Sequence, residues 1–404
     1  MPIAVAAPVA LPPHAHRNYS RTPMNVYWET TRACPLACRH CRAEAVLAPH
    51  PDELTTAEAS QLLLQIAEFG DPLPQLILTG GDPLSRPDLL PLLDCARGLG
   101  LRVSITPAAS PALTRERLVQ LQAAGVEALG LSLDGSTPAR HDRLRGVPGT
   151  FDRTLDALLW GRELGFPLQV NSLVSAETAD DLPAIYELLR PLGIARWSLF
   201  FLIAVGRGHQ LQPLSPAQAE SLMHWIFECS RQAPFIVATT EAPSYRRLTL
   251  TERRGQGVGS WRQLGDALSA SGRPLPGIEA RPPSDQRERP GQKVASHVPT
   301  ATGSRAWGIR DGHGIVFVSH TGEIYPSGFL PLSAGNIRRQ PLAEVYRTAP
   351  LFAALHDPRQ FHGRCGRCEF QAVCGGSRAR AYAATGDPLA ADPLCAFEPG
   401  SLRA

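Results

Sequence analysis

Segments with the patterns of strands and helices alternate six times between residue 25 and about residue 230 of this 404-residue chain. Repeated strand–helix alternation predicts a parallel β-sheet with right-handed crossovers. Helix starts support this pattern, because Thr55 and Glu58 form a capping box and Ser215-Pro216 is a cap followed by proline. The expected strands are residues 25–29, 75–79, 102–106, 128–133, 168–174 and 197–202.

Six units are too few to close an eight-fold barrel. We therefore predict an α/β fold in which residues 25–232 form an open, partial (β/α)6 barrel, with a doubly wound sheet as the alternative. In either fold the chemistry is expected at the carboxyl ends of the strands.

Three cysteines follow the first expected strand. Cys34, Cys38 and Cys41 have the spacing C-x3-C-x2-C. Three thiolates on one tight loop can bind three irons of a cubane 4Fe-4S cluster and leave the fourth iron open to another ligand. A zinc knuckle or part of a disulfide framework is the alternative, but His40 and His50 do not fit zinc-finger spacing. The spacing therefore favours a reactive iron–sulfur cluster.

This cysteine segment resembles the signature of the radical S-adenosylmethionine (SAM) superfamily. The resemblance implies that Cys34, Cys38 and Cys41 are the catalytic ligands of a SAM-binding 4Fe-4S cluster, and that His40 packs beside the cofactor. It also implies that SAM is cleaved reductively to methionine and a 5′-deoxyadenosyl radical, which abstracts hydrogen from the substrate.

Two glycines end the second expected strand. Gly80 and Gly81, followed by Asp82, let backbone groups approach a ligand closely, although a Gly-Gly-Asp run alone is more often only a turn. With the cysteines, this run resembles the Gly-Gly-Glu motif of the family, which contacts the amino group of SAM. Aspartate stands here in place of the usual glutamate.

Three further residues are expected to contact SAM. Ser132 or Asp134, after the fourth strand, can hydrogen-bond the sugar or the carboxylate of the cofactor, and Arg145 can pair with its carboxylate. A capped turn with a surface arginine is the alternative. The resemblance places Asn171, on the fifth strand, near the ribose.

Four cysteines form a second group near the C-terminus, with a CxxC opening that suits zinc or an iron–sulfur cluster. Their context resembles the SPASM/twitch-type extension of radical SAM enzymes. Ser327 and Ser377 stand where fuller extensions have cysteines of a second auxiliary cluster. The resemblance therefore implies one auxiliary 4Fe-4S cluster, which serves electron transfer or oxidation of a substrate radical. Its ligands would be Cys365, Cys368, Cys374 and Cys395.

The remaining segments divide by composition. Residues 1–24 are interrupted by prolines and are expected to be disordered, and residues 251–306 are expected to be a flexible insertion rich in Gly, Pro, Ser and Arg. Residues 307–404 are expected to form the SPASM/twitch-like domain. It should contain a hairpin at 314–325 and a helix near 342–355.

Composition excludes several classes of protein. The net charge is only +3 and no basic block occurs, so nucleic-acid binding is not expected. No eighteen apolar residues run together and no basic signal-peptide segment is present, so neither a membrane span nor secretion is expected. Seven of the nine cysteines lie in two tight groups, which indicates metal ligation in a reducing cytoplasm. Cys95 and Cys229 fall in expected helices and are interpreted as buried apolar residues.

Residues 374–395 are similar to the haem-biosynthesis branch of the family, whose enzymes act on porphyrin propionates in haem d1 formation and in iron-coproporphyrin decarboxylation. The expected activity is therefore radical SAM chemistry on a tetrapyrrole propionate, with a reductant such as flavodoxin or ferredoxin. A peptide-modifying radical SAM enzyme and a non-catalytic iron–sulfur carrier are the alternatives. Arg378 and Arg380 are interpreted either as partners of propionates or as solvated helix charges.

Overall fold

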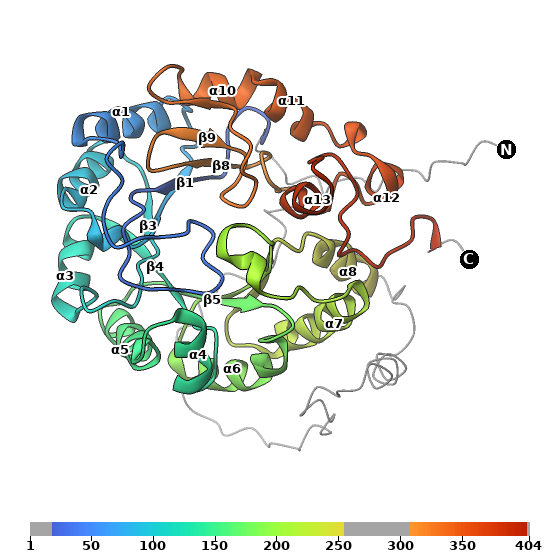
Figure 1. Ribbon diagram of the computed structural model, residues 1–404, viewed down its shortest axis with the longest axis horizontal. Helices are drawn as coiled ribbons and strands as arrows, with labels where there is room; N and C mark the ends of the chain where they lie inside the picture. Colours follow the sequence, from blue (N-terminus) through green and yellow to red (C-terminus); the bar gives the residue numbers. More distant parts are fainter. Residues whose placement is uncertain (1–17, 254–307, 402–404) are drawn as a thin grey trace, which may run out of the picture.

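The computed structural model describes residues 18–253 and 308–401 of the chain. They contain one ten-stranded sheet with the order β10-β9-β8-β1-β2-β3-β4-β5-β6-β7. The sheet curves inside an outer layer of helices (Figure 1) and its edge strands, β10 and β7, do not pair with each other. The predicted open, partial barrel is therefore confirmed.

The strand–helix part of the described chain contributes seven parallel strands, β1 to β7, one more than the sequence predicts. The extra strand, β7, has the β-branched sequence Ile-Val-Ala-Thr-Thr, which favours a strand but has little apolar alternation. β7 belongs to the barrel because it pairs with β6 in parallel. The strands are β1 (Asn25–Glu29), β2 (Gln75–Thr79), β3 (Val103–Ile105), β4 (Val126–Ser132), β5 (Leu168–Val174), β6 (Arg196–Phe201) and β7 (Ile236–Thr240).

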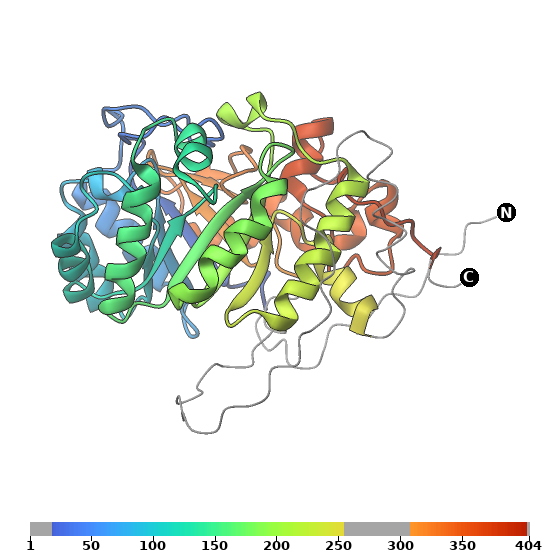
Figure 2. The same cartoon turned by 90° about the horizontal axis from the view of Figure 1, so that it is seen from below.

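Helices cover the outer face of these strands (Figure 2). The two predicted helix starts are confirmed, since Thr55 and Ser215 each form a capping box with the residue three positions on. The helices are α1 (Thr56–Ala67), α2 (Leu89–Gly98), α3 (Arg115–Ala123), α4 (Pro138–Arg145), α5 (Thr150–Glu163), α6 (Leu182–Leu189), α7 (Pro216–Gln232) and α8 (Ser244–Arg253).

The two faces of the curved sheet differ in burial. Outward-facing residues such as Trp28 and Trp197 are fully buried against the helices. Residues on the inner face alternate with them, and several, such as Tyr27, Asn171 and Phe200, are only partly buried. A closed barrel of this kind fills its interior with side chains, so partial burial indicates an open interior. We call this inner face the lumen; it includes Tyr27, Ile77, Ser132, Asn171 and Phe200.

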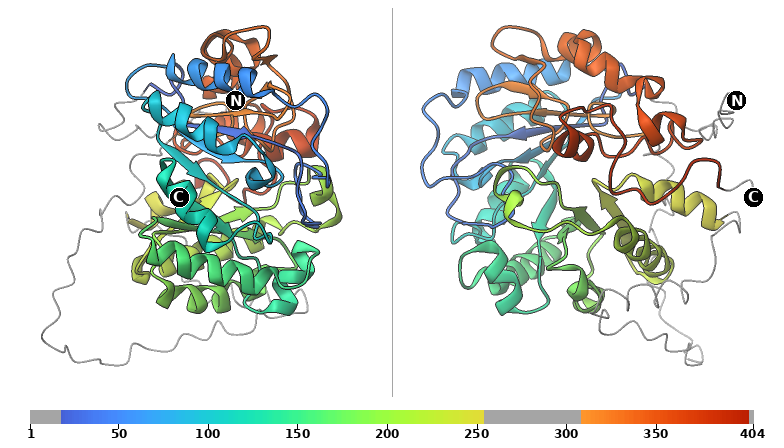
Figure 3. Two further views of the ribbon diagram at one scale, coloured as in Figure 1. Left: turned by 90° about the vertical axis from the view of Figure 1, so that its left-hand side faces the viewer. Right: turned by 45° about the vertical axis from the view of Figure 1, so that its right-hand side comes forward.

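The C-terminal segment lies between α1 and α8, on the side where the barrel is open (Figures 1 and 3). The predicted hairpin is confirmed as β8 (Ile315–Val318) and β9 (Glu323–Tyr325). β8 also pairs in parallel with β1, so the hairpin continues the barrel sheet to β10 (Gly335–Asn336).

Two helices replace the single helix expected near residues 342–355. The break falls before Pro350, because the residue that precedes a proline is disfavoured in helical conformation, and Ala349 is extended. The C-terminal helices are α10 (Leu342–Thr348), α11 (Pro350–His356), α12 (Gly363–Arg367) and α13 (Arg378–Thr385).

The two segments expected to be disordered or flexible, residues 1–24 and 251–306, lie mostly outside the described residues. The structure does not describe residues 1–17 and 254–307. Residues 18–24, which were expected to be disordered, include the buried Tyr19. Residues 251–253 complete α8. Across the described ranges, no helix combines the length and apolar character that crossing a bilayer requires.

Substitutions at two leucines of helix α1 test how this helix packs on the sheet. Leu62 is fully buried against the sheet, whereas Leu64 on the same helix is 41% exposed. We expect Leu62→Ala to lower the free energy of unfolding by about 2–5 kcal/mol, because it leaves a cavity in the core. Leu64→Ala should change it by less than about 0.5 kcal/mol. Urea unfolding of the two variants measures the difference, and equal effects would contradict the assigned face of α1.

Candidate active site

The three-cysteine loop lies at the carboxyl end of β1. Cys34 and Cys38 are buried and Cys41 is partly buried, and all three belong to one small apolar cluster. Burial, with smaller contributions from the neighbouring Asp82, Cys38 and Cys41, raises the pKa of the Cys34 thiol to about 12. Three crowded thiolates therefore need a cationic group to be stable together, as an iron–sulfur cluster provides.

The two glycines after β2 support this loop through backbone contacts. The Gly81 N–H donates to the Thr31 carbonyl at 2.8 Å, and the Asp82 N–H donates to the Ala33 carbonyl at 2.7 Å. A Cβ atom at Gly81 would lie 2.3 Å from the Ala33 oxygen, and one at Gly80 would lie 2.5 Å from the Thr31 oxygen. Only glycine permits this approach of the β2 end to the cysteine loop.

Asp82 points into the protein at this end of the sheet. Its carboxylate accepts from the Ser110 hydroxyl at 2.8 Å and from the backbone N–H groups of Leu84 and Ala108. Burial raises its pKa. Asp82 thus caps a turn beside the cysteine loop, and its contact with SAM stays a prediction.

Arg145 is not a surface arginine. It forms an ion pair with Asp134, and its Nη1 lies 3.7 Å from Cys38 Sγ. Burial lowers the pKa of Arg145, but the charges of Asp134 and Cys38 outweigh burial and raise it. The last carbonyls of α4 also hold the loop, since Leu144 accepts from the Arg39 N–H at 2.9 Å.

Two buried polar atoms beside the loop have no hydrogen-bond partner within the described part of the chain. They are His40 Nδ1 and Arg207 Nη2. Burial and the nearby Arg145 lower the pKa of His40 to about 4, so its imidazole is neutral at pH 7. Because buried polar atoms are normally paired, these two mark a place where a ligand fits.

Arg207 was missed by the sequence analysis. It lies in a short 3-10 helix after β6 and donates from Nε to the Cys38 carbonyl at 2.9 Å. Its own N–H donates to the Cys41 carbonyl at 3.0 Å. Nothing in the local sequence marks it, because its contact with the loop is made across 169 positions.

Ser132 and Asn171 lie side by side in the lumen. They are register partners on β4 and β5, and both are partly exposed. The Gln169 amide donates to Asn171 Oδ1 at 2.8 Å. The structure thus brings the two predicted residues together, and their contact with SAM stays a prediction.

A buried ion-pair cluster connects the loop to the C-terminal hairpin. Glu29 binds Arg42 at 2.5 Å and His320 at 2.6 Å. Burial opposes ionisation of Glu29, but Arg42 and His320 lower its pKa to about 2. Arg42 also stacks on Phe317, 4.6 Å from the ring centre. This cluster was also missed, because its members come together only through the β1–β8 pairing.

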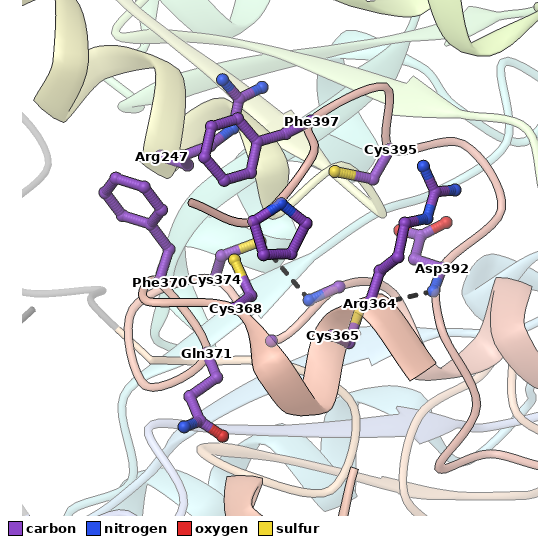
Figure 4. Close-up of a pocket in the computed structure, with 13 residues that line it drawn as sticks. Arg247, Arg364, Cys365, Cys368, Phe370, Gln371, Cys374, Asp392, Cys395 and Phe397 are labelled. Carbon is purple, nitrogen blue, oxygen red and sulfur yellow. Dashed lines mark hydrogen bonds between the residues drawn. The ribbon is translucent and has the colours of Figure 1, made fainter. Parts of the chain in front are cut away.

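The second cysteine group lines a small, partly open cavity (Figure 4). Figure 4 shows Cys365, Cys368, Cys374 and Cys395 around this space. Burial raises the pKa of the thiols of Cys368, Cys374 and Cys395. In the described ranges, no three His, Cys, Asp or Glu side chains are arranged to hold a single metal ion.

The two arginines of α13 are buried, so the interpretation as solvated helix charges is wrong. Arg378 is fully buried and lies 3.5 Å from Cys365 Sγ. Arg380 pairs with Asp392 at 3.3 Å and donates to the Glu241 carbonyl at 2.7 Å. Both guanidinium groups are thus used inside the protein, beside the cysteines.

An open parallel barrel with a three-cysteine loop at the carboxyl end of its first strand defines an iron–sulfur enzyme of the SAM-dependent class. Residues 28–189 match the Radical SAM superfamily. An AdoMet-dependent heme synthase of Methanosarcina barkeri is 36% identical over 381 residues, which are 94% of this chain and 98% of the relative. This chain therefore belongs to the radical SAM superfamily, and SAM and a 4Fe-4S cluster are its cofactors.

Other relatives have related names. An AdoMet-dependent heme synthase of Nitratidesulfovibrio vulgaris is 33% identical over 398 residues, 98% of each chain. A PqqA peptide cyclase of Rhizobium meliloti is 25% identical over 97% of this chain and 92% of that one. The chain is thus a radical SAM enzyme close to the haem-biosynthesis synthases. The iron–sulfur carrier alternative is wrong, and the peptide-modifying alternative fits less well.

Solved structures share the fold. Streptococcus suis SuiB, bound to its precursor peptide, has a TM-score of 0.64 at 16% identity, over 93% of this chain and 76% of that one. The enzyme anSMEcpe with bound AdoMet has a TM-score of 0.62 at 14% identity, over 92% and 94%. At these identities the likeness concerns the fold alone.

The glycine contact can be tested by adding one methyl group. Gly81→Ala should displace the Ala33 carbonyl and with it the cysteine loop, because the new Cβ would lie within 2.3 Å. We expect cluster incorporation at the first site, measured as iron and labile sulfide after reconstitution, to fall at least about tenfold. Gly98→Ala is the control, since nothing lies within 4 Å of its Cβ position. Normal cluster content in Gly81→Ala would contradict the inference that the close contact at Gly81 positions the cysteine loop.

Proposed function

We propose that this enzyme converts propionate side chains of an iron-coproporphyrin to vinyl groups, as an AdoMet-dependent haem synthase. The observation that carries the proposal is the identity of 33–36% with proteins of that name, over more than nine tenths of this chain and of each relative. Residues 25–232 carry the SAM chemistry in this proposal, and residues 307–404 carry the auxiliary group.

The proposed SAM site lies at the carboxyl ends of β1 and β2. Cys34, Cys38 and Cys41 hold the cluster, and the partly buried, neutral His40 packs beside the cofactor. The bound cluster and SAM supply a 5′-deoxyadenosyl radical that abstracts hydrogen. The chain's own residues orient the cofactor: the backbone at Gly80 and Gly81, Asp82, and the lumen residues Ser132 and Asn171, with Arg145 beside Cys38.

Arg145 also has an electrostatic role in this proposal. Its guanidinium is shared between Asp134 and Cys38, so it neutralises a carboxylate and a cluster ligand in one buried place. A free carboxylate that entered this site would compete with Asp134 for the same cation. The expected contact with the SAM carboxylate therefore requires Arg145 to turn away from Asp134 or to bind both.

The second cysteine group is proposed to hold one auxiliary 4Fe-4S cluster. The four thiolates line one cavity, an arrangement that suits a 4Fe-4S group with four protein ligands. Arg378 beside Cys365 and Arg247 at the cavity wall offset its negative charge. Ser377 is committed elsewhere, since its hydroxyl donates to Glu241 at 2.5 Å.

An auxiliary cluster would also balance the reaction. Conversion of a propionate carboxylate to a vinyl group releases CO2, one hydrogen atom and one electron. The hydrogen atom leaves with the 5′-deoxyadenosyl group, so the electron needs an acceptor. An auxiliary cluster with four protein ligands has no open iron and is suited to this task. A cytoplasmic location and a flavodoxin or ferredoxin as reductant complete the proposal.

Iron content tests the auxiliary cluster. We expect about eight irons per anaerobically reconstituted chain. Cys368→Ser should lower this to about four irons and leave reductive SAM cleavage in place, because it removes a ligand of the second group only. Cys95→Ser, in α2, is the control and should keep about eight irons. About twelve irons, or four irons with one zinc, would contradict the proposal.

The substrate is tested with the reduced enzyme and SAM. With iron-coproporphyrin we expect 5′-deoxyadenosine and a porphyrin that has lost the elements of formic acid at each converted side chain, measured by mass spectrometry. A panel of peptides is the control and should give no mass change. Modification of a peptide with no change in the porphyrin would favour the peptide-modifying alternative.

A further inference from the structure

Arg196 is a partly buried cation that forms no ion pair with any residue the structure describes. Within residues 18–253 and 308–401, every other buried or partly buried arginine donates a hydrogen bond or forms an ion pair. Arg196 does neither. Arg145, Arg378 and Arg380, by contrast, are bound to internal groups. Arg196 is therefore the guanidinium left free to bind something else.

The alternation of β6 places Arg196 in the lumen. Trp197, the next residue, is fully buried on the outer face, where its ring lies 6.1 Å from Tyr186 of α6 and 6.4 Å from Trp225 of α7. Successive side chains of a strand point to opposite faces. Arg196 therefore faces inward, on the same face as the partly exposed Phe200.

Tyr27 faces the lumen as well. It lies on the inner face of β1, four strands away from β6 in the sheet order, and each of the two side chains acts on the charge of the other. Burial raises the pKa of the Tyr27 phenol, so it stays protonated. Its oxygen accepts from the Asn25 amide at 3.5 Å, and no described residue accepts its O–H.

Among the residues with a described structure, no carboxylate pairs with Arg196. Burial lowers its pKa, and Tyr27 is the one group that opposes this effect. A buried guanidinium without a counter-ion is unfavourable, and a bound anion removes that penalty. The planar fork of arginine matches a carboxylate, and a phenol O–H beside it adds a donor.

We propose that Arg196 and Tyr27 bind a carboxylate of the substrate that does not react, and so determine substrate specificity. This inference rests on the proposed function, in which the substrate carries several propionates. Arg196 begins β6, and the cysteine loop lies at the other ends of the strands. Five residue steps along β6 span about 17 Å. A macrocycle with carboxylates on opposite edges can present one to the reactive end while Arg196 holds another.

Absorbance titrations of the reconstituted enzyme test the proposal without turnover. The ligands are iron-coproporphyrin III and its tetramethyl ester, which has the same ring and no carboxylates. We expect Arg196→Gln to weaken binding of the acid about 10- to 100-fold and to leave binding of the ester unchanged. Arg196→Lys should recover part of the loss, and Tyr27→Phe should weaken acid binding by a smaller factor.

Arg102→Gln is the matched control, because Arg102 is exposed just before β3 and pairs with Glu127. It should bind both ligands like the wild type. Equal weakening of acid and ester by Arg196→Gln, or no weakening of either, overturns the inference while the proposed function stands. If the wild type binds neither porphyrin but still cleaves SAM, the proposed function fails and the inference fails with it.

Discussion

The three-cysteine loop depends on a backbone contact between the end of β2 and the segment that precedes Cys34. The end of β2 donates from Gly81 and Asp82 to the carbonyls of Thr31 and Ala33, immediately before Cys34. Any side chain at Gly81 would occupy the position of the Ala33 oxygen. Two neighbouring parallel strands thus fix the start of the cysteine loop. The C-terminal end of α4 and Arg207 then hold the rest of it.

The charges around the two cysteine groups follow one pattern. Each cysteine group has an arginine in contact with one of its sulfur atoms or carbonyls. These arginines are themselves bound to other groups: Arg145 pairs with Asp134, and Arg378 donates to the Ala390 carbonyl. Clusters with thiolate ligands carry negative charge in a poorly solvated place, so buried cations stabilise them. Arg196 differs because it lies in the lumen and has no such partner.

The C-terminal segment both extends the barrel and carries the second cysteine group. β8 pairs with β1, and the Glu29–Arg42–His320 cluster fastens this hairpin to the cysteine loop. On the other side, Ser377 and Arg380 bind Glu241 at the end of β7. The segment therefore contacts both β1 and β7, and the second cysteine group is attached to both edges of the open barrel.

The sequence alone determined the barrel class, the three-cysteine loop and the four cysteines of the second group, because strand–helix alternation, ligand spacing and glycine pairs are local patterns. The tertiary structure decided the rest. The parallel pairing of β8, the burial of Arg378 and Arg380, and the places of Arg42 and Arg207 depend on contacts between distant segments. The same holds for Arg196: it precedes the strand that the sequence predicts at 197–202, and only the structure makes it the first residue of β6 and places it on the inner face, as it does Tyr27.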